Sequence, residues 1–249
     1  MSDTAAVPES KVQEASAASD RESFPPAPTD IAGDFQGEVN TDDQLPSAET
    51  LDQVASYTVL DREHKEHSFR DLYAGVDAAP RTLVIFVRHF FCGSCQEYLR
   101  SLSDTITPDF LAQLPTRTAV VIVGCGDPGL IDHYAAETGC PFPIYSDPTA
   151  QLYEALGMVS SLALGPRPAY IRKGMARIVA ESVWQALKYV PSGLATKAGD
   201  SRQIGGEFLF ESDPSQGEGK DLTSITWCHR MKTTRDHSEV SVLASLLQR

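Results

Sequence analysis

The chain lacks a long hydrophobic run and a recognisable export signal, and both absences narrow its class. Its most apolar stretch, residues 82–87, is six residues long and is followed by Arg88 and His89. Such a stretch is too short to cross a membrane and is typical of a buried strand. Residues 1–4 carry neither the basic nor the apolar region of a secretory signal. We therefore expect a cytoplasmic protein with no membrane contact.

Basic residues are scarce at the start of the chain. The first 50 residues hold 11 acidic and 2 basic side chains, a charge of -9 out of the total of -13, which leaves -4 for the rest. This excess of negative charge argues against a nucleic-acid-binding arm. Residues 1–48 also have few long apolar side chains, so they cannot bury enough surface to offset their chain entropy. The sequence predicts a disordered acidic tail over residues 1–48 and one folded domain over residues 49–249.

Cysteines are few, and no export signal accompanies them. The five are Cys92, Cys95, Cys125, Cys140 and Cys228. In a compartment that keeps thiols reduced, cysteines are more often free, catalytic or metal-binding than joined in structural disulfides.

The rest of the chain alternates between strand and helix patterns. Strands are expected at residues 55–60, 82–87, 119–123, 142–145, 207–210 and 222–229. Helices are expected at residues 68–73, 96–114 with a break at Pro108, 128–138, 150–156, 175–190 and 239–247. Because the run at 82–87 is apolar on both faces, it indicates a central strand covered by helices. The order of elements predicts an α/β fold with a mixed central sheet flanked by helices.

The motif that carries chemistry is Cys92-Gly93-Ser94-Cys95, where the strand at 82–87 gives way to a helix. The free amides and the dipole at a helix N-terminus stabilise a thiolate and lower its pKa. A spacing of three places the second sulfur one turn further along the same side of the helix. The two sulfurs can then close a disulfide, which is what two-electron thiol chemistry needs.

Two other interpretations of the cysteine pair remain open. The pair can be two inert buried thiols, because free cysteine is commonly a core residue. It can also be half of a structural zinc site. The two remaining zinc ligands would then be two of Cys125, Cys140, Cys228, His133 and His229.

Two residues just before the motif can influence a thiolate. Arg88 and His89 precede Cys92 by four and three positions, and a positive charge on either would lower the thiol pKa. Alternatively, Arg88 pairs with an acid such as Glu97, and His89 is a partly buried imidazole. Glu97 can relay a proton to the second thiol or lie on the helix surface. Cys125 follows a strand and is expected at the same edge of the sheet as the pair.

The segment around the cysteines also resembles a known family. Residues 86–98 (FVRHFFCGSCQEY) closely resemble the active-site segment of the peroxiredoxin-like 2 proteins, which are thioredoxin-like proteins with an AhpC/TSA antioxidant domain. Residues 143–148 (PIYSDP), 156–158 (LGM), 203–208 (QIGGEF) and 227–230 (WCHR) agree with the family as well. The resemblance runs from about Leu51 to the end of the chain. It implies a thioredoxin-like fold and an antioxidant thiol oxidoreductase activity.

The resemblance also implies roles for the two cysteines. By analogy, Cys92 would be the attacking thiol and Cys95 the resolving one, with Arg88 and His89 beside them. Aligning the Thr-x-x-Cys motif of peroxiredoxins proper instead puts Cys95 at the attacking position, so both assignments stay open. Residues 203–206 (QIGG) stand where a thioredoxin carries Thr-Pro.

The implied reaction is reduction of a peroxide-like or disulfide substrate, without cofactor or metal. A thiol reductant such as thioredoxin or glutathione would restore the pair, and no nucleic acid would take part. The alternative is a non-catalytic redox sensor or adaptor on the same fold.

Overall fold

The computed structural model describes residues 1, 41–75, 77–212 and 223–249. Most of the acidic tail expected over residues 1–48 lies outside the described residues, as does most of the segment between the strands expected at residues 207–210 and 222–229. Within the described ranges, no helix has the length and apolar character needed to cross a membrane.

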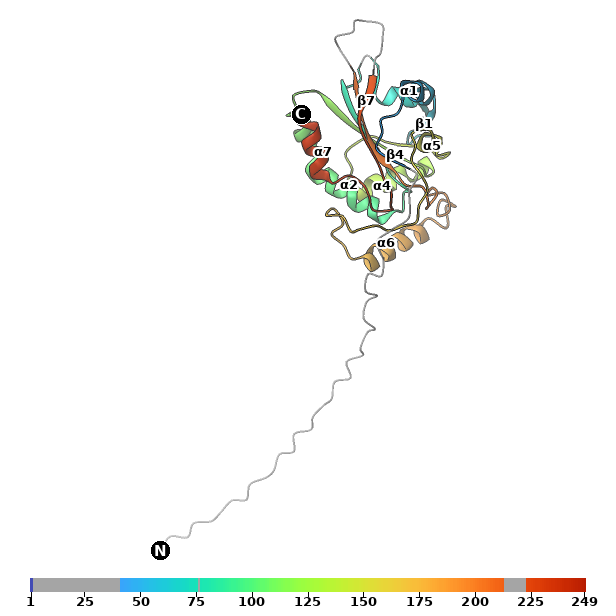
Figure 1. Ribbon diagram of the computed structural model, residues 1–249. Coiled ribbons are helices and arrows are strands. Elements are labelled where there is room, and N and C mark those ends of the chain that lie inside the picture. Colours follow the sequence, from blue (N-terminus) through green and yellow to red (C-terminus); the bar gives the residue numbers. More distant parts are fainter. Residues whose placement is uncertain (2–40, 76, 213–222) are drawn as a thin grey trace. The chain divides into compact units, whose positions relative to one another are not determined.

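A seven-stranded mixed sheet forms the centre of the domain, with the order β2-β1-β5-β4-β3-β6-β7 (Figure 1). The strands are β1 (Thr58–Leu60), β2 (Glu66–Ser68), β3 (Arg81–Phe86), β4 (Thr118–Gly124), β5 (Ile144–Ser146), β6 (Gly206–Ser212) and β7 (Thr223–Arg230). Strands β3, β4 and β5 run parallel to one another, whereas β6 pairs antiparallel with both β3 and β7. The sheet is therefore mixed, as the sequence predicts.

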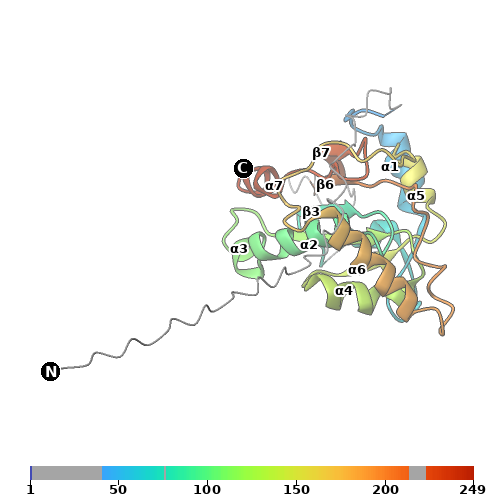
Figure 2. The ribbon, with the colours of Figure 1, turned by 90° about the horizontal axis from the view of Figure 1, so that it is seen from below.

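Helices cover both faces of this sheet. They are α1 (Ala48–Ala55), η1 (Phe69–Leu72), α2 (Gly93–Thr105), α3 (Pro108–Ala112), η2 (Pro128–Leu130), α4 (Ile131–Thr138), α5 (Gln151–Ala155), α6 (Met175–Lys188) and α7 (Val240–Leu247). One hydrophobic core gathers under α2, α4 and α7, and a second gathers under α1, η1 and α5. Figure 2 shows α6 on the outer side of α2 and α4.

The central part of the sheet has thioredoxin-like topology. A β3–α2–β4 unit and a β6–β7–α7 unit bring four strands together in the order β4-β3-β6-β7. Both α2 and α7 lie against the same core, and they contact each other. The fold class expected from the sequence is thus confirmed.

The two-sided burial of β3 follows from its alternating side chains. Leu83 and Ile85 enter the core under α2, whereas Val84 and Phe86 enter the core under α1 and α5. Successive residues of a strand point to opposite faces, so a strand that is apolar throughout requires a cover on both sides.

Two elements differ from the sequence-based expectation. The strand expected over residues 55–60 is wrong at its start, because α1 occupies Ala48–Ala55 and β1 begins at Thr58. Helix α1 is only 8 residues long and buries only Val54, so little of it packs against the core. Residues 66–68, where no strand is expected, form strand β2. The break expected at Pro108 is confirmed: α2 ends at Thr105, and α3 begins with Pro108 in its first turn.

Candidate active site

The cysteine pair lies at the start of α2, just beyond the end of β3. Cys92 is the residue that precedes the helix, with an extended backbone (φ -72°, ψ 103°), and its N–H donates to the His89 carbonyl over 2.8 Å. Both thiols are free. Cys92 is 4% exposed and Cys95 is fully buried. The pair therefore stands at the strand–helix junction that its sequence context predicts, but beneath the surface.

Arg88 holds its guanidinium group directly against the first sulfur. Its Nη1 donates to Cys92 Sγ over 3.1 Å. Its Nε donates to the Gln203 carbonyl over 3.3 Å, and its Nη2 donates to the Ser201 carbonyl. The side chain is only 7% exposed. Two backbone oxygens from the loop before β6 thus fix a buried positive charge beside Cys92.

The two thiols have opposite electrostatic characters. Hydrogen bonding from Cys95 and the nearby charge of Arg88 hold the pKa of Cys92 well below its usual value, although burial acts in the other direction. Burial and the hydrogen bond to Cys92 raise the pKa of Cys95 well above its usual value. Stabilising one thiolate makes ionisation of its close neighbour harder. Of the two thiols, Cys92 is thus the one that ionises more readily.

His89 and Cys125 also lie at this edge of the sheet. Burial and the charge of Arg88 lower the pKa of His89, so its ring is neutral at neutral pH even though Cys92 favours the charged form. Cys125 donates from Sγ to the Arg88 carbonyl over 3.2 Å. Burial raises the pKa of Cys125 to about 12. The fixed positive charge near Cys92 is therefore that of Arg88, and Cys125 stays a thiol.

The loop before β6, which includes residues 198–200, lies against this edge of the sheet. Gly199 has a left-handed backbone (φ +110°), and a Cβ there would lie 2.6 Å from Cys125 Sγ, so the loop passes too close for another side chain. The Ala198 carbonyl of this loop accepts from the Phe90 N–H over 3.0 Å. The loop also borders a surface hollow of about 490 Å³, lined by Cys125, Asp127, Pro148, Thr196, Lys197, Gly199 and Asp200.

Residues 203–206 (QIGG), which stand where a thioredoxin carries Thr-Pro, pass close to the end of β3. A Cβ on Gly205 would lie 1.8 Å from the Phe86 carbonyl oxygen, so only glycine fits there. Just before it, Gln203 supplies a carbonyl to Arg88. Residues 203–206 therefore contact both the end of β3, through Gly205, and Arg88, whose guanidinium contacts Cys92 Sγ.

Helix α6 covers the start of α2 from the outside. A Cβ on Gly93 would lie 2.4 Å from Ile178 Cγ2, which shows how closely α6 approaches the cysteine motif. The side-chain amides of Gln96 and Gln185 exchange two hydrogen bonds, of 2.7 and 3.1 Å, within the buried contact. Gln185 was not among the residues singled out in the sequence, because a lone glutamine on a helix carries no signal.

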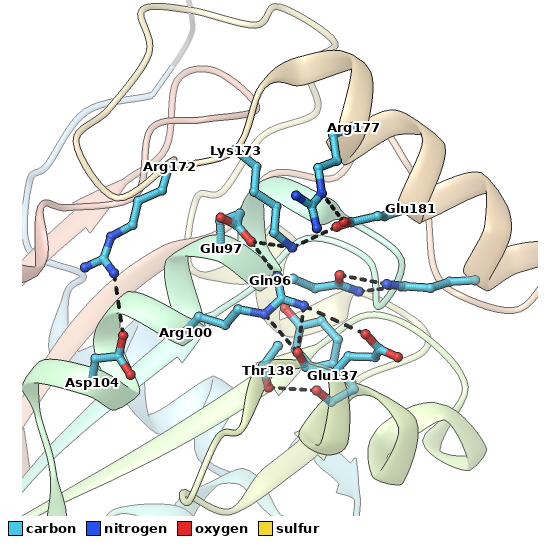
Figure 3. Close-up of polar contacts among 12 residues, drawn as sticks. Gln96, Glu97, Arg100, Asp104, Glu137, Thr138, Arg172, Lys173, Arg177 and Glu181 are labelled. Atoms are coloured by element: carbon cyan, nitrogen blue, oxygen red, sulfur yellow. Dashed lines mark hydrogen bonds and ion pairs between the residues drawn. The ribbon is translucent and has the colours of Figure 1, made fainter.

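Ion pairs continue this contact along both helices (Figure 3). Glu97, only 6% exposed, pairs with Arg100 over 2.5 Å and with Lys173 over 3.2 Å. Lys173 also pairs with Glu181 over 2.8 Å, and Arg177 pairs with Glu181 over 2.7 Å. Glu97 thus serves this network, and it does not pair with Arg88 as one interpretation of the sequence suggested.

The other cysteines lie apart from the pair. Cys140 Sγ faces the Phe142 carbonyl over 3.9 Å, and Cys228 Sγ faces the carbonyls of Asp43 and Gln44 over 3.4 and 3.5 Å. In the described part of the chain, no group of three or more His, Cys, Asp or Glu side chains is placed to hold a metal ion. The zinc interpretation of the pair therefore gains no support from these residues.

Comparisons with known proteins find similarity to AhpC/TSA and peroxiredoxin-like proteins. The model of the AhpC/TSA antioxidant enzyme family matches residues 101–233, just over half of the chain, and this match begins after Cys95. Peroxiredoxin-like 2C from Homo sapiens is 28% identical over 196 residues, which are 78% of this chain and 78% of that protein. Peroxiredoxin-like 2C from Takifugu rubripes is 26% identical over 200 residues, 79% of this chain and 80% of that protein.

Among solved structures, peroxidoxin BcpB from Mycobacterium tuberculosis is similar, with a TM-score of 0.47 and 10% identity. That alignment covers 79% of this chain and 93% of the other.

Proposed function

The chain belongs to the AhpC/TSA antioxidant enzyme family, and on this premise we propose that it is a thiol oxidoreductase in which the Cys92 thiolate attacks and the Cys95 thiol resolves. The observation that carries the proposal is the contact of Arg88 Nη1 with Cys92 Sγ at 3.1 Å. A thiolate is the reactive form of cysteine, and a neighbouring cation keeps it ionised at neutral pH. The opposite pKa shifts of the two thiols support the same assignment.

With a peroxide, the Cys92 thiolate attacks one oxygen and breaks the O–O bond. That oxygen stays on sulfur as a sulfenic acid, while the other leaves, takes up a proton and becomes an alcohol or water. The Cys95 thiol then attacks the sulfenic sulfur, which forms the Cys92–Cys95 disulfide and releases water. A thiol reductant of the thioredoxin or glutathione class supplies two electrons and two protons to restore both thiols.

Burial of the pair favours a small substrate. Cys92 is 4% exposed, and α6 and the loop before β6 both lie close to it. A small hydroperoxide needs far less displacement of these segments than a protein disulfide does. Arg88 holds the thiolate in place during attack, and the neutral His89 ring lies beside it.

The test is peroxide reduction coupled to NADPH oxidation through a thioredoxin or a glutathione system. We expect turnover in the natural chain, its loss in Cys92→Ser, and its retention in Cys125→Ser, which is the matched control for a buried thiol at the same edge. In Cys95→Ser, one equivalent of peroxide is consumed and dimedone labels Cys92.

Two outcomes contradict this proposal. Equal activity in the natural chain and in Cys92→Ser shows that the attacking group lies elsewhere. Consumption of a single equivalent of peroxide by the natural chain, with both reductant systems present, favours the sensor or adaptor alternative.

A further inference from the structure

A glutamate and a histidine form a pair in the interior of the domain. Glu207 on β6 is fully buried, and His237, in the segment before α7, is 4% exposed. His237 Nδ1 lies 2.6 Å from Glu207 Oε1, and the Ser238 N–H donates to Glu207 Oε2 over 3.4 Å. Ionisable side chains are rarely buried to this degree, and those that are gather at functional sites.

The pair lies on the same side of the sheet as the cysteine motif. Glu207 pairs with Ile85 of β3, whose side chain enters the core under α2. Residues directly opposite each other on antiparallel strands turn their side chains to the same face. On this side of the sheet, Cys95 and Tyr98 are both fully buried and lie one turn apart on the same face of α2. The Glu207 carboxylate and the resolving thiol therefore share one core.

Two tyrosines connect the pair to Cys95. The ring of Tyr98 stacks on the ring of His237, with centroids 4.1 Å apart and planes 2° from parallel. The hydroxyl of Tyr170 accepts from the His237 N–H over 3.2 Å, and its ring packs on Tyr98 with centroids 5.1 Å apart. Burial first, and then the charges of Glu207 and Cys95, raise the pKa of both hydroxyls. Both hydroxyls therefore lie within electrostatic reach of the acid and of the thiol.

The hydrogen bonds of the pair define where it can take up a proton. A carboxylate only accepts hydrogen bonds, so His237 Nδ1 carries the hydrogen and donates it to Glu207. His237 Nε2 is buried and has no hydrogen-bond partner among the described residues. A second N–H there would be a buried donor without an acceptor, which favours the neutral ring with a bare Nε2. The pair then carries one negative charge and has one free position for a proton.

Resolution of a sulfenic acid needs such a position. Cys95 must lose its proton to attack as a thiolate, and burial and the hydrogen bond to Cys92 raise its pKa well above the usual value. A guanidinium cannot accept the proton, which excludes Arg88. A thiolate at Cys95 also adds negative charge to a core that already holds Glu207. If the proton passes to the pair, the net charge of the core stays the same.

We propose that Glu207 and His237 are positioning residues for the resolving step, and that they take up the Cys95 proton by way of the tyrosine hydroxyls. This inference rests on the proposed function, in which Cys95 attacks a sulfenic acid on Cys92. The sulfur–sulfur bond forms as the sulfur–oxygen bond breaks. The departing hydroxide takes the proton back from the pair and becomes water, so the pair ends in the state in which it began.

The charged groups on the elements around the pair have partners of their own among the described residues. His229 lies opposite Glu207 in the pairing of β6 with β7. Its two ring nitrogens lie 3.3 Å from Asp43 Oδ2 and 2.7 Å from the Asp236 carbonyl oxygen. The other partnered groups are Arg235, Asp236 and Glu239. These contacts leave the imidazole of the pair as the group with a free buried nitrogen.

The test separates the two chemical steps as a function of pH. The reduced full chain is mixed rapidly with one equivalent of hydrogen peroxide and quenched in acid. Mass spectrometry then distinguishes the sulfenic acid, with one added oxygen, from the disulfide, with two hydrogens lost. Formation of the sulfenic acid is expected to be the same in Glu207→Gln as in the natural chain, because Cys92 and Arg88 are untouched.

Resolution is expected to differ between the two chains. In Glu207→Gln it is slower by about 10-fold or more at neutral pH. Its rate then rises with hydroxide concentration, which deprotonates Cys95 directly, and meets that of the natural chain at high pH. Glu211→Gln is the matched control, because Glu211 lies on the same strand but pairs with Arg81 at the far end of β3. It is expected to resolve like the natural chain at every pH.

A second variant guards against misfolding of the first. Glu207→Leu/His237→Phe removes both members of the pair, so neither is left buried without its partner, and it keeps an aromatic ring against Tyr98. It is expected to show the same dependence of resolution on pH as Glu207→Gln.

Four results overturn the inference. Resolution that is slower by the same factor at every pH shows that the pair has a structural role alone. An unchanged resolution rate shows that the pair takes no part. A pH dependence that is altered by His89→Gln, and not by the variants of the pair, assigns the proton acceptor to His89. The fourth is a natural chain that forms no sulfenic acid at all, which overturns the proposed function itself and is thereby distinguished from the other three.

Discussion

Replacing Arg88 with glutamine is expected to raise the pKa of the Cys92 thiol by about two units. The guanidinium lies 3.1 Å from the sulfur and is 7% exposed, so solvent screens it little. Without this cation the thiolate loses its nearest positive charge, while the neutral thiol loses almost nothing. The Cys92 pKa therefore rises, and the thiolate fraction falls at every pH between the pKa of the natural chain and that of Arg88→Gln.

The size of the shift follows from the separation of the charges. Two unit charges about 3 Å apart interact by roughly 5 kcal/mol at an effective dielectric constant of 20. Water and the new amide group recover part of that energy, so a net loss of about 2.7 kcal/mol, equal to about two pKa units, is expected. Arg88→Lys keeps the positive charge but loses the planar guanidinium group, and we expect it to raise the Cys92 pKa by less than half as much.

The assay is thiolate absorbance at 240 nm against pH in the reduced protein, because it needs no reagent to reach the buried sulfur. Cys125 and Cys140, with pKa values raised by burial to about 12 and about 11, titrate above the range of interest. Arg100→Gln is the matched control, since Arg100 also lies at α2 but pairs with Glu97. A midpoint for Arg88→Gln within about half a unit of the natural chain would refute the reasoning.

Other predictions concern the contact between α2 and α6. Gly93→Ala is expected to displace α6, since the new methyl group meets Ile178, and to speed the reaction of Cys92 with a disulfide reagent about tenfold; an unchanged rate would contradict this. Gln185→Leu leaves the side-chain oxygen Oε1 of Gln96 without its hydrogen-bond donor. We expect it to lower the free energy of unfolding in urea by about 1–3 kcal/mol. A free energy equal to or higher than that of the natural chain would count against the amide pair. Raising salt toward ~1 M is expected to weaken the ion pairs that join α2 to Arg172 and Lys173, just before α6, and to speed the reaction of Cys92 with the disulfide reagent. A rate that does not depend on salt would argue that these pairs do not hold α6.

Much of the sheet and the position of the cysteine pair could be predicted from local pattern. The runs at residues 82–87 and 119–123 are apolar on both faces, and only a central strand makes use of such a pattern. The Cys92–Cys95 spacing after the first of these runs placed the pair at the start of a helix. These features depend on neighbouring residues alone, so the sequence displays them directly.

The environment of the thiolate could not be predicted in the same way. Arg88 is fixed by the carbonyl oxygens of Ser201 and Gln203, and backbone atoms leave no signature in the residue types. The spacing of Val179, Val183 and Leu187 predicts a helix but not which side faces the domain. The structure turns them outward because the other face of α6 packs Met175, Ile178 and Ala186 against the core, beside the Gln96–Gln185 amide pair.

One long connection, from the end of α5 to the start of β6, supplies both α6 and the carbonyl oxygens that hold Arg88. The strands and α2 carry the sulfurs, whereas this connection determines how exposed and how acidic the first sulfur is. Its residues add no strand to the sheet, so substitutions at its exposed positions leave the strand order unchanged, whereas Gly205 at its end admits no other residue. Substitutions at exposed positions of this connection are therefore the means to change the reactivity of Cys92 without altering the strands and α2, which carry the sulfurs.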